Sequence, residues 1–277
     1  DDCFYARKGV EMARRGALLT VTWNGEHTFQ NPPLSFWILG RSFALLGEND
    51  LAARLPSALM GVGIVLVAWR IGRRVVGDAA ALGGAALLLA TPFFLQNGRR
   101  CMLEIPSTFW QTLALLVFVE AGLAKSPPAR PSPWLAAVAL PLGAALATKS
   151  VLGLLPAVVM AAAALLVPAL RRLRRSPWLW LGLAGGVALG AVWPLHQGLA
   201  FGWDAVRAHF LGEVGRHAAG GAASGAAGDA AAGVAGGAAA VAGLAARAGG
   251  WLVGYPLILL RWFQPVALLG LAGAVVV

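Results

Sequence analysis

Long apolar stretches separated by short polar segments dominate the chain. Seven such stretches occur, at roughly residues 55–69, 79–97, 105–124, 134–148, 151–170, 178–195 and 257–277. A helix that crosses the hydrocarbon core of a bilayer needs about 20 residues, and lipid offers no hydrogen-bond partner to an open backbone. The pattern therefore predicts an all-α fold, a polytopic membrane protein of about seven transmembrane helices.

Two shorter amphipathic helices are predicted before the first span, within residues 1–54. In the first, over residues 2–18, apolar positions lie among basic ones, namely Phe4, Val10, Met12 and Leu18 among Arg7, Lys8, Arg14 and Arg15. The second begins at Asn31-Pro32-Pro33-Leu34, where proline is tolerated in the first turn, and ends at Gly47. Helices of this kind are expected to lie in the membrane interface.

The composition supports a membrane protein over other classes. Hydrophobic residues make up 58% of the chain and charged residues 12%, against about 25% charged residues in a typical soluble domain. The 22 Lys and Arg exceed the 12 Asp and Glu, which gives a net charge of +10. A nucleic-acid-binding protein would gather basic residues on a polar face, and a disordered chain would have far fewer apolar residues. We expect neither.

The charges alternate between successive loops. Three loops hold nine basic residues and adjoin a single acid, Asp78; they lie at 70–74, 125–130 and 171–175. By the positive-inside rule, these loops are cytoplasmic. Ten of the twelve acids and all four histidines fall on the opposite side, which comprises residues 1–54, 98–104, 149–150 and 196–256. Because the titratable groups gather there, we expect the chemistry on the outer, or periplasmic, face.

The chain is interpreted as one transmembrane domain over residues 1–277. It consists of an outer loop, six spans, a large outer loop and a last span, at 1–54, 55–195, 196–256 and 257–277. Within the large loop, 27 of the 33 residues of 218–250 are Ala or Gly, so no catalytic role is expected for that segment. The start at Asp1 and the apolar end suggest a fragment of a longer protein.

Short motifs follow one another along the predicted outer loops. They are Asp1-Asp2-Cys3-Phe4-Tyr5-Ala6, Phe29-Gln30-Asn31-Pro32-Pro33-Leu34-Ser35-Phe36-Trp37, Ala53-Arg54-Leu55-Pro56-Ser57, Gly98-Arg99-Arg100-Cys101-Met102-Leu103-Glu104, Ala147-Thr148-Lys149-Ser150 and Phe210-Leu211-Gly212-Glu213-Val214-Gly215-Arg216-His217. In this order, they resemble the GT-C superfamily of polyprenyl-phosphate-dependent glycosyltransferases. That superfamily includes protein mannosyltransferases and bacterial aminoarabinose transferases that act on lipid A. The resemblance covers about residues 1–217 and, more weakly, 251–270.

The resemblance implies inverting transfer of a sugar from a polyprenyl-phosphate donor to a hydroxyl group of lipid A, a glycan or a protein. It implies Asp1 as the general base, with Asp2 beside it, because the acceptor hydroxyl must lose a proton. From the local sequence alone, a helix N-cap is the simpler interpretation of these two aspartates.

Further roles follow from the same resemblance. Lys149, Arg216 and Arg100 are implied as ligands of the donor phosphate. Lys149 also fits a side chain that extends to the membrane surface, and Arg99 and Arg100 also fit anchors of a span. Acceptor contacts, or support of the catalytic residues, are implied for Tyr5, Glu104, Gln30 and Asn31.

The pair Gln30-Asn31 departs from the Glu-Lys pair of the aminoarabinose transferases, where the Glu looks like a metal ligand and the Lys like a phosphate contact. Either no divalent metal is bound here, or other side chains provide its ligands, with His27, His209, His217, Glu213 and Glu26 as candidates. Scattered histidines without ligand spacing are more typical of a protein surface than of a metal site. No cofactor is required by the motifs themselves.

Two alternatives to an enzyme remain. A transporter or flippase would need charged residues along a central path, whereas Glu120 is the only acid inside a predicted span, near its cytoplasmic end. A GT-C-like protein that only binds lipid is the other alternative, because Gln30-Asn31 departs from the pattern of the active enzymes.

Overall fold

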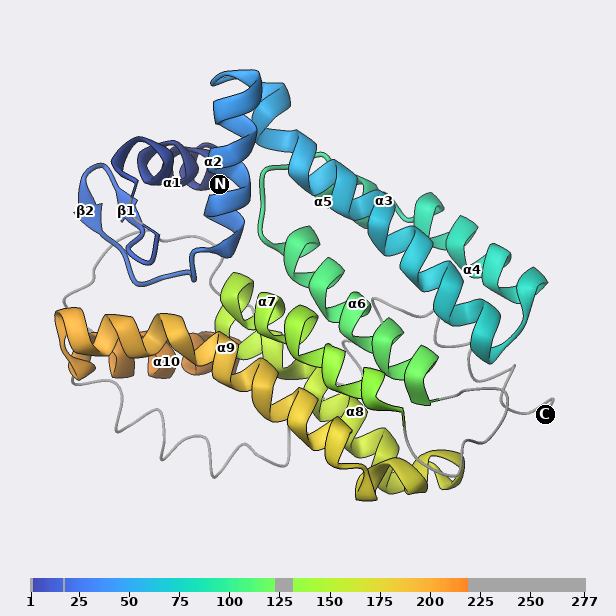
Figure 1. The fold of residues 1–277 in the computed structure, drawn as a ribbon. Helices are drawn as coiled ribbons and strands as arrows, with labels where there is room; N and C mark the ends of the chain where they lie inside the picture. The colour runs from blue at the N-terminus through green and yellow to red at the C-terminus, as the bar shows by residue number, and fades with distance from the viewer. Residues whose placement is uncertain (1, 17, 123–131, 219–277) are drawn as a thin grey trace. The chain divides into compact units, whose positions relative to one another are not determined.

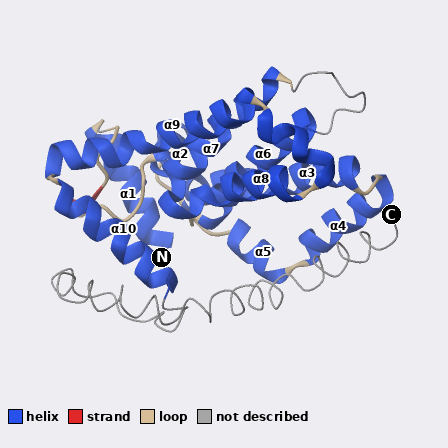
Figure 2. Ribbon diagram, turned by 90° about the horizontal axis from the view of Figure 1, so that it is seen from below, coloured by secondary structure: helices blue, strands red, loops and turns tan. Residues whose placement is uncertain are grey.

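The computed structural model of the chain describes residues 2–16, 18–122 and 132–218. These residues are almost entirely helical (Figure 2), apart from an antiparallel hairpin of two short strands, β1 (Thr22–Trp23) and β2 (Glu26–His27). The α-helices are α1 (Asp2–Arg15), α2 (Leu34–Leu46), α3 (Asp50–Val75), α4 (Asp78–Ala90), α5 (Pro92–Gly98), α6 (Glu104–Gly122), α7 (Ala139–Lys149), α8 (Leu155–Leu166), α9 (Pro177–Phe201) and α10 (Trp203–Ala218). Three 3-10 helices join them, η1 (Pro133–Val138), η2 (Ser150–Leu154) and η3 (Pro168–Arg175). The all-α prediction is confirmed, whereas the hairpin was not predicted.

The described residues fall into two units, one up to Ala200 and one from Phe201 onward. The first holds α1 to α9 and every contact discussed below between helices. The second is described here by α10 alone. The predicted last span, 257–277, and residues 219–250 of the Ala/Gly-rich segment lie outside the described residues.

Several helices are long and apolar enough to cross a membrane. Helix α3 has 26 residues and begins where the Asn49 side chain accepts a hydrogen bond from the backbone N–H of Ala52 (2.9 Å). Helix α9, with 25 residues, and the apolar segment Pro133–Leu166 also qualify. Helices α4 and α5 qualify only together, because the chain bends by 67° between them, at Pro92. The described part thus contains three such segments, or four with the bent pair.

The segment Pro133–Leu166 reverses direction at the turn between Lys149 and Ser150. Lys149, the last residue of α7, reaches Glu104 at the start of α6. After α8, η3 returns to the other end of α6, where Arg172 Nη2 donates to the Gly122 carbonyl (2.9 Å). Helices α7 and α8 therefore run in opposite directions (Figure 1), as expected of the two predicted spans 134–148 and 151–170.

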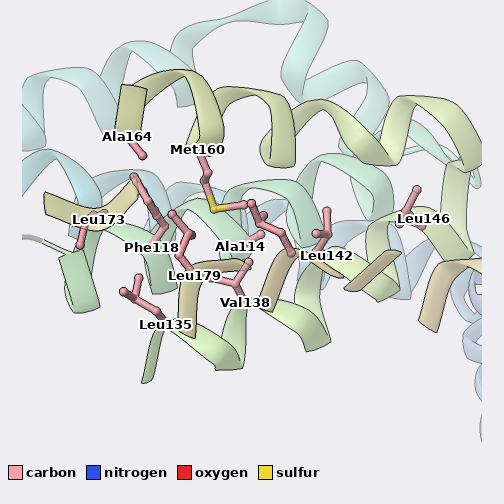
Figure 3. Close-up of a cluster of buried hydrophobic side chains, with 11 residues drawn as sticks. Ala114, Phe118, Leu135, Val138, Leu142, Leu146, Met160, Ala164, Leu173 and Leu179 are labelled. Carbon is pink, nitrogen blue, oxygen red and sulfur yellow. The ribbon is translucent and has the colours of Figure 1, made fainter. Parts of the chain in front are cut away.

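Helix α6 lies at the centre of the first unit, in contact with α3, α7, η1 and α8. A cluster of buried apolar side chains joins it to its neighbours (Figure 3), made of Ala114, Phe118, Leu135, Val138, Leu142, Leu146, Met160, Ala164, Leu173, Leu179 and Leu183. In lipid, where apolar burial gives little drive to associate, such packing contacts hold helices together.

The two predicted amphipathic helices are present as α1 and α2, and they pack closely against each other. A Cβ atom on Gly9 would lie 2.8 Å from the Leu39 Cβ, so glycine is needed for this approach. A second buried cluster connects these helices to α3 and to the segment before α6, made of Met12, Val21, Phe36, Leu39, Phe43, Ala52, Ala53, Cys101 and Leu103.

Basic residues gather at one end of the helices, which we call the basic end. Glu120, near the end of α6, forms ion pairs with two arginines. Its Oε1 lies 2.6 Å from Arg70 Nε, and its Oε2 lies 2.9 Å from Arg74 Nε. Arg172 reaches Gly122 at the same end of α6. Two of the three loops predicted to share a side thus meet, and Lys125 and Arg130 of the third lie outside the described residues. Glu120 is near a helix end, as predicted, with two arginine partners beside it.

The opposite end, called the α1 end, contains α1, the hairpin, α2, residues 98–104 and the turn 149–150. Gln197 Nε2 donates to the Leu19 carbonyl (2.7 Å), which brings the last part of α9 to the same end. The structure therefore separates the predicted outer segments from the basic loops within the first unit.

Candidate functional site

Glu104 and Lys149 meet at the α1 end. Lys149 Nζ lies 2.8 Å from Glu104 Oε1, and the Lys149 and Glu104 side chains are only 21% and 37% exposed, respectively. Glu104 Oε2 is buried and accepts no hydrogen bond from the described residues. This half-buried pair joins α6 to α7 and leaves one buried carboxylate oxygen without a hydrogen bond from the described residues. The sequence predicted Lys149 for the donor phosphate and Glu104 for the acceptor, and the structure shows that these two residues form an ion pair.

The hairpin is fixed to α1 by the buried carboxylate of Glu11. Arg7 Nε and the Thr22 hydroxyl each donate to it at 2.9 Å, and the backbone N–H groups of Asn24 and Gly25 donate at 2.9 and 3.2 Å. Burial by itself would raise the pKa of Glu11, but the hydrogen bonds, led by that of Arg7, outweigh it and lower the pKa. Glu11 thus remains a carboxylate and positions the loop that leads to Gln30.

Lys8 is completely buried on the side of α1 that packs against α2. Its Nζ lies 3.8 Å from the centre of the Phe4 ring and 5.7 Å from that of Phe36, and it donates to Gln30 Oε1 at 3.4 Å. Burial lowers the pKa of Lys8 to about 7. The prediction had counted Lys8 among the basic positions of an amphipathic helix. Its spacing of four residues from Phe4 and from Met12 places it on the apolar stripe instead, and this signal could have revealed it.

Tyr5 is half-buried, and its ring stacks on Phe36 with 6.4 Å between the ring centres. It lines a small pocket between α1, α2, α3 and the segment before α6. The other lining residues are mostly apolar, and the buried Ser35 hydroxyl has no hydrogen-bond partner among the described residues.

The other predicted residues are dispersed around this end. Gln30 is exposed and Asn31 half-buried, directly before Pro32-Pro33. Arg99 and Arg100 are exposed in the turn before α6, and neither forms an ion pair with a described side chain. The structure thus brings Tyr5 near Phe36 and joins Gln30 to Lys8, but it does not join Arg100 to the Glu104–Lys149 pair.

The remaining candidates lie partly outside the described residues. This holds for Asp1 entirely and for the side chains of Asp2, Glu213, Arg216 and His217. His27 is exposed on β2, whereas His209 is buried in α10 of the second unit, beside Phe210 with 5.3 Å between ring centres.

The metal candidates can be compared with what a divalent ion requires. A metal site needs several converging carboxylate, histidine or cysteine ligands. Across the part of the chain that the structure describes, no three such side chains converge. Near Gln30, where the resemblance implies a metal ligand, the described partner is the Lys8 ammonium. The described residues therefore do not fit a metal at this position.

The fold is all-α, and its apolar helices carry acidic, basic and aromatic side chains at one end. These features define the class as a polytopic membrane protein with a polar site at that end. Residues 30–195 match the family of dolichyl-phosphate-mannose-protein mannosyltransferases. This match covers more than half of the chain, which therefore belongs to that family. The predicted membership in the GT-C superfamily is confirmed.

Relatives agree with this assignment. An uncharacterized protein of Aquifex aeolicus (strain VF5) is 33% identical over 121 residues, 43% of this chain and 24% of that protein. Undecaprenyl phosphate-alpha-4-amino-4-deoxy-L-arabinose arabinosyl transferase of Pseudomonas aeruginosa (strain LESB58) is 30% identical over 162 residues, 57% of this chain and 29% of that protein. The chain thus spans about a quarter of the length of these curated relatives.

Solved structures show the same fold. ArnT from Cupriavidus metallidurans in the apo state is 25% identical, with a TM-score of 0.62, over 73% of this chain and 38% of that chain. The structure of the same protein bound to undecaprenyl phosphate gives a TM-score of 0.60 at 24% identity, with the same coverage.

Proposed function

We propose that this chain is part of an integral-membrane glycosyltransferase that moves a sugar from a polyprenyl-phosphate donor to a hydroxyl group of lipid A, a glycan or a protein. The observation that carries the proposal is the family match over residues 30–195, on a fold that resembles ArnT. The named bacterial relative is an arabinosyl transferase that uses undecaprenyl phosphate-linked aminoarabinose, and a sugar donor of this type is proposed here.

The proposed reaction is a displacement at the anomeric carbon that needs a general base and cations for the departing phosphate. The acceptor oxygen attacks the anomeric carbon on the face opposite the phosphate, so that the carbon–oxygen bond to the phosphate breaks and the configuration inverts. Asp1 takes the proton of the acceptor hydroxyl, with Asp2 next to it. The departing polyprenyl phosphate gains negative charge, and cationic side chains stabilise it.

The described contacts give Lys149 and Glu104 related roles in this proposal. Lys149 provides a cation at a helix end next to apolar spans, where the phosphate of a lipid in the bilayer can reach it. Glu104 holds Lys149 in place through its Oε1 atom and offers its other oxygen to an acceptor hydroxyl. Arg216 and Arg100 are proposed as further phosphate ligands.

The separation of charges favours an enzyme over a transporter. A transporter would place acidic or basic groups along a central path, whereas Glu120 pairs with Arg70 and Arg74 at the basic end. We place the α1 end at the periplasmic face of a bacterial inner membrane, because the basic end carries the positive charge typical of cytoplasmic loops.

The general base is tested with Asp1→Asn in the complete protein, purified and supplied with a polyprenyl-phosphate-linked sugar and an acceptor. We expect transfer to fall by about 100-fold or more, because general-base catalysis contributes roughly that much. Donor binding is expected to persist. Asp78→Asn is the matched control, since Asp78 is an acid at the basic end, and its transfer rate should match that of the unchanged protein. If Asp1→Asn retains full turnover, Asp1 is not the base.

A further inference from the structure

Lys8 has an environment that its role in packing does not explain. The side chain is completely buried between aromatic rings. Its one polar contact in the described structure is the neutral Gln30 oxygen, at 3.4 Å. Within the described residues, no carboxylate pairs with it, whereas seven of the arginines and Lys149 do have such partners.

An ammonium group in this position is costly. Transfer of a charge from water to an apolar environment is unfavourable unless a counter-ion or several hydrogen bonds compensate. One long hydrogen bond and two ring faces compensate only in part. An apolar side chain such as Met would fill the same space without that cost. A buried, uncompensated charge of this kind is typical of a functional site.

The surroundings of Lys8 indicate where a counter-ion would enter. Gln30, which accepts the hydrogen bond from the buried Lys8 Nζ, is itself exposed. Asn31 follows directly, and it brings no charge where the resemblance implies a phosphate-binding lysine. Tyr5, on the same helix, lines the pocket at this end. A phosphate oxygen can thus replace Gln30 Oε1 as the acceptor from Lys8.

We propose that Lys8 is the cation that binds the phosphate of the lipid donor in this chain, in place of the charge that is absent at Asn31. Gln30 holds the ammonium group in the free protein and is displaced by a phosphate oxygen. The proposal rests on the proposed function, since it assigns a residue to the same site. The ligand is the phosphate on the polyprenyl chain, which is a diester in the sugar-bearing donor and becomes a monoester once the sugar has left.

Other charged groups near α1 are already engaged or lie elsewhere. On α1 itself, Glu11 accepts from Arg7 and from the hairpin. The elements packed against α1 carry Glu26 and His27 on the hairpin and Arg41 on α2, all exposed. Because these groups are present in every variant at position 8, a comparison of such variants isolates the Lys8 charge.

Binding is measured by native mass spectrometry of the complete protein with undecaprenyl phosphate, undecaprenol and inorganic phosphate as separate probes. Lys8→Met is expected to weaken the binding of undecaprenyl phosphate by about tenfold or more, as for the loss of a charged hydrogen bond. Binding of undecaprenol should not change. Arg14→Met is the matched control, because it removes an exposed cation from the same helix and should leave both affinities unchanged.

The pH dependence separates a ligand from a packing residue. Between pH 7.5 and 9, a phosphate monoester stays doubly charged, whereas Lys8 loses its proton, since its pKa is about 7. The affinity of the unchanged protein for undecaprenyl phosphate is therefore expected to fall about tenfold over this range. Lys8→Arg keeps its charge, so its affinity should stay level.

The outcomes are distinguishable. If the unchanged protein does not prefer undecaprenyl phosphate over undecaprenol, the proposed function fails. If it does prefer it and Lys8→Met binds equally well, the Lys8 assignment alone is overturned. If inorganic phosphate binds as tightly as the lipid and with the same dependence on Lys8, the ligand is free phosphate and the donor assignment is wrong. Lys8→Met should melt at the same or a higher temperature, so loss of folding will not imitate loss of binding.

Discussion

Glu11 shows how one buried side chain determines local structure at the α1 end. Its two oxygens accept four hydrogen bonds, two of them from the backbone of the hairpin turn. Nothing in the sequence pattern singled it out, because a Glu within a basic amphipathic helix usually faces solvent. Lys8 was missed because a Lys in such a helix also usually faces solvent, although its spacing from Phe4 and Met12 places it on the apolar stripe. Periodicity assigns a residue to a face of a helix, but the partner across that face depends on tertiary packing.

Glu11→Gln is expected to lower the thermal stability of the first unit. The amide keeps the shape, but it loses the charge that faces Arg7 and turns a donor toward backbone N–H groups, at a cost of about 1–3 kcal/mol. The check is a melting curve in detergent at pH 7. Glu48→Gln is the control, since Glu48 is half-exposed in its pair with Arg14 and should change stability by no more than about 0.5 kcal/mol.

The pH dependence of this effect has a definite sign. The pKa of Glu11 is lower in the folded chain than its ordinary value of 4.5, so the unfolded chain binds more protons below that pH. The stabilisation by Glu11 is thus complete above pH 4.5 and is lost as the pH falls through the folded-state pKa. The difference between Glu11→Gln and the unchanged protein should shrink in acid; a difference that is constant with pH would contradict this role of the charge.

At the scale of elements, hydrophobic pattern and helix-end signals predicted most of the fold. Both amphipathic helices, the end of α2 at Gly47 and the reversal at Lys149 were predicted, because proline, glycine and charged residues mark helix ends. The hairpin was not, since two-residue strands are too short to show alternation. The 67° bend between α4 and α5 was also missed, although Pro92 marks its position.

The orientation of the two ends is tested by cysteine labelling in cells. Cys3 is exposed at the α1 end and Cys101 is buried, so Cys3 is a natural reporter once the other cysteines are removed. A maleimide that cannot cross the inner membrane should label Cys3 from the periplasm. In a Cys3→Ser background, Asp78→Cys should be labelled only after the inner membrane is permeabilised. Labelling of both positions from the same side would contradict the orientation.

At the scale of the whole molecule, the order of short motifs predicted the family, and the match over residues 30–195 confirms it. The sequence did not predict which of the candidate site residues contact one another. Lys149 and Glu104 were assigned separately, yet they are partners, and spacing of 45 residues could not show this. The sequence did show that Gln30-Asn31 lacks the charges of the Glu-Lys pair found in the aminoarabinose transferases. The contact between Gln30 and a lysine 22 residues earlier depends on the tertiary structure, which the sequence pattern does not show.

The central claim is that the protein transfers a sugar from a polyprenyl-phosphate donor. It is tested most directly by mass spectrometry of membrane lipids and glycoproteins from cells with and without the intact gene. Without the gene, we predict that a polyprenyl-phosphate-linked sugar accumulates and that one pentose- or hexose-sized unit disappears from a lipid A, glycan or protein acceptor. Unchanged levels of both the donor lipid and every glycosylated acceptor would contradict the claim.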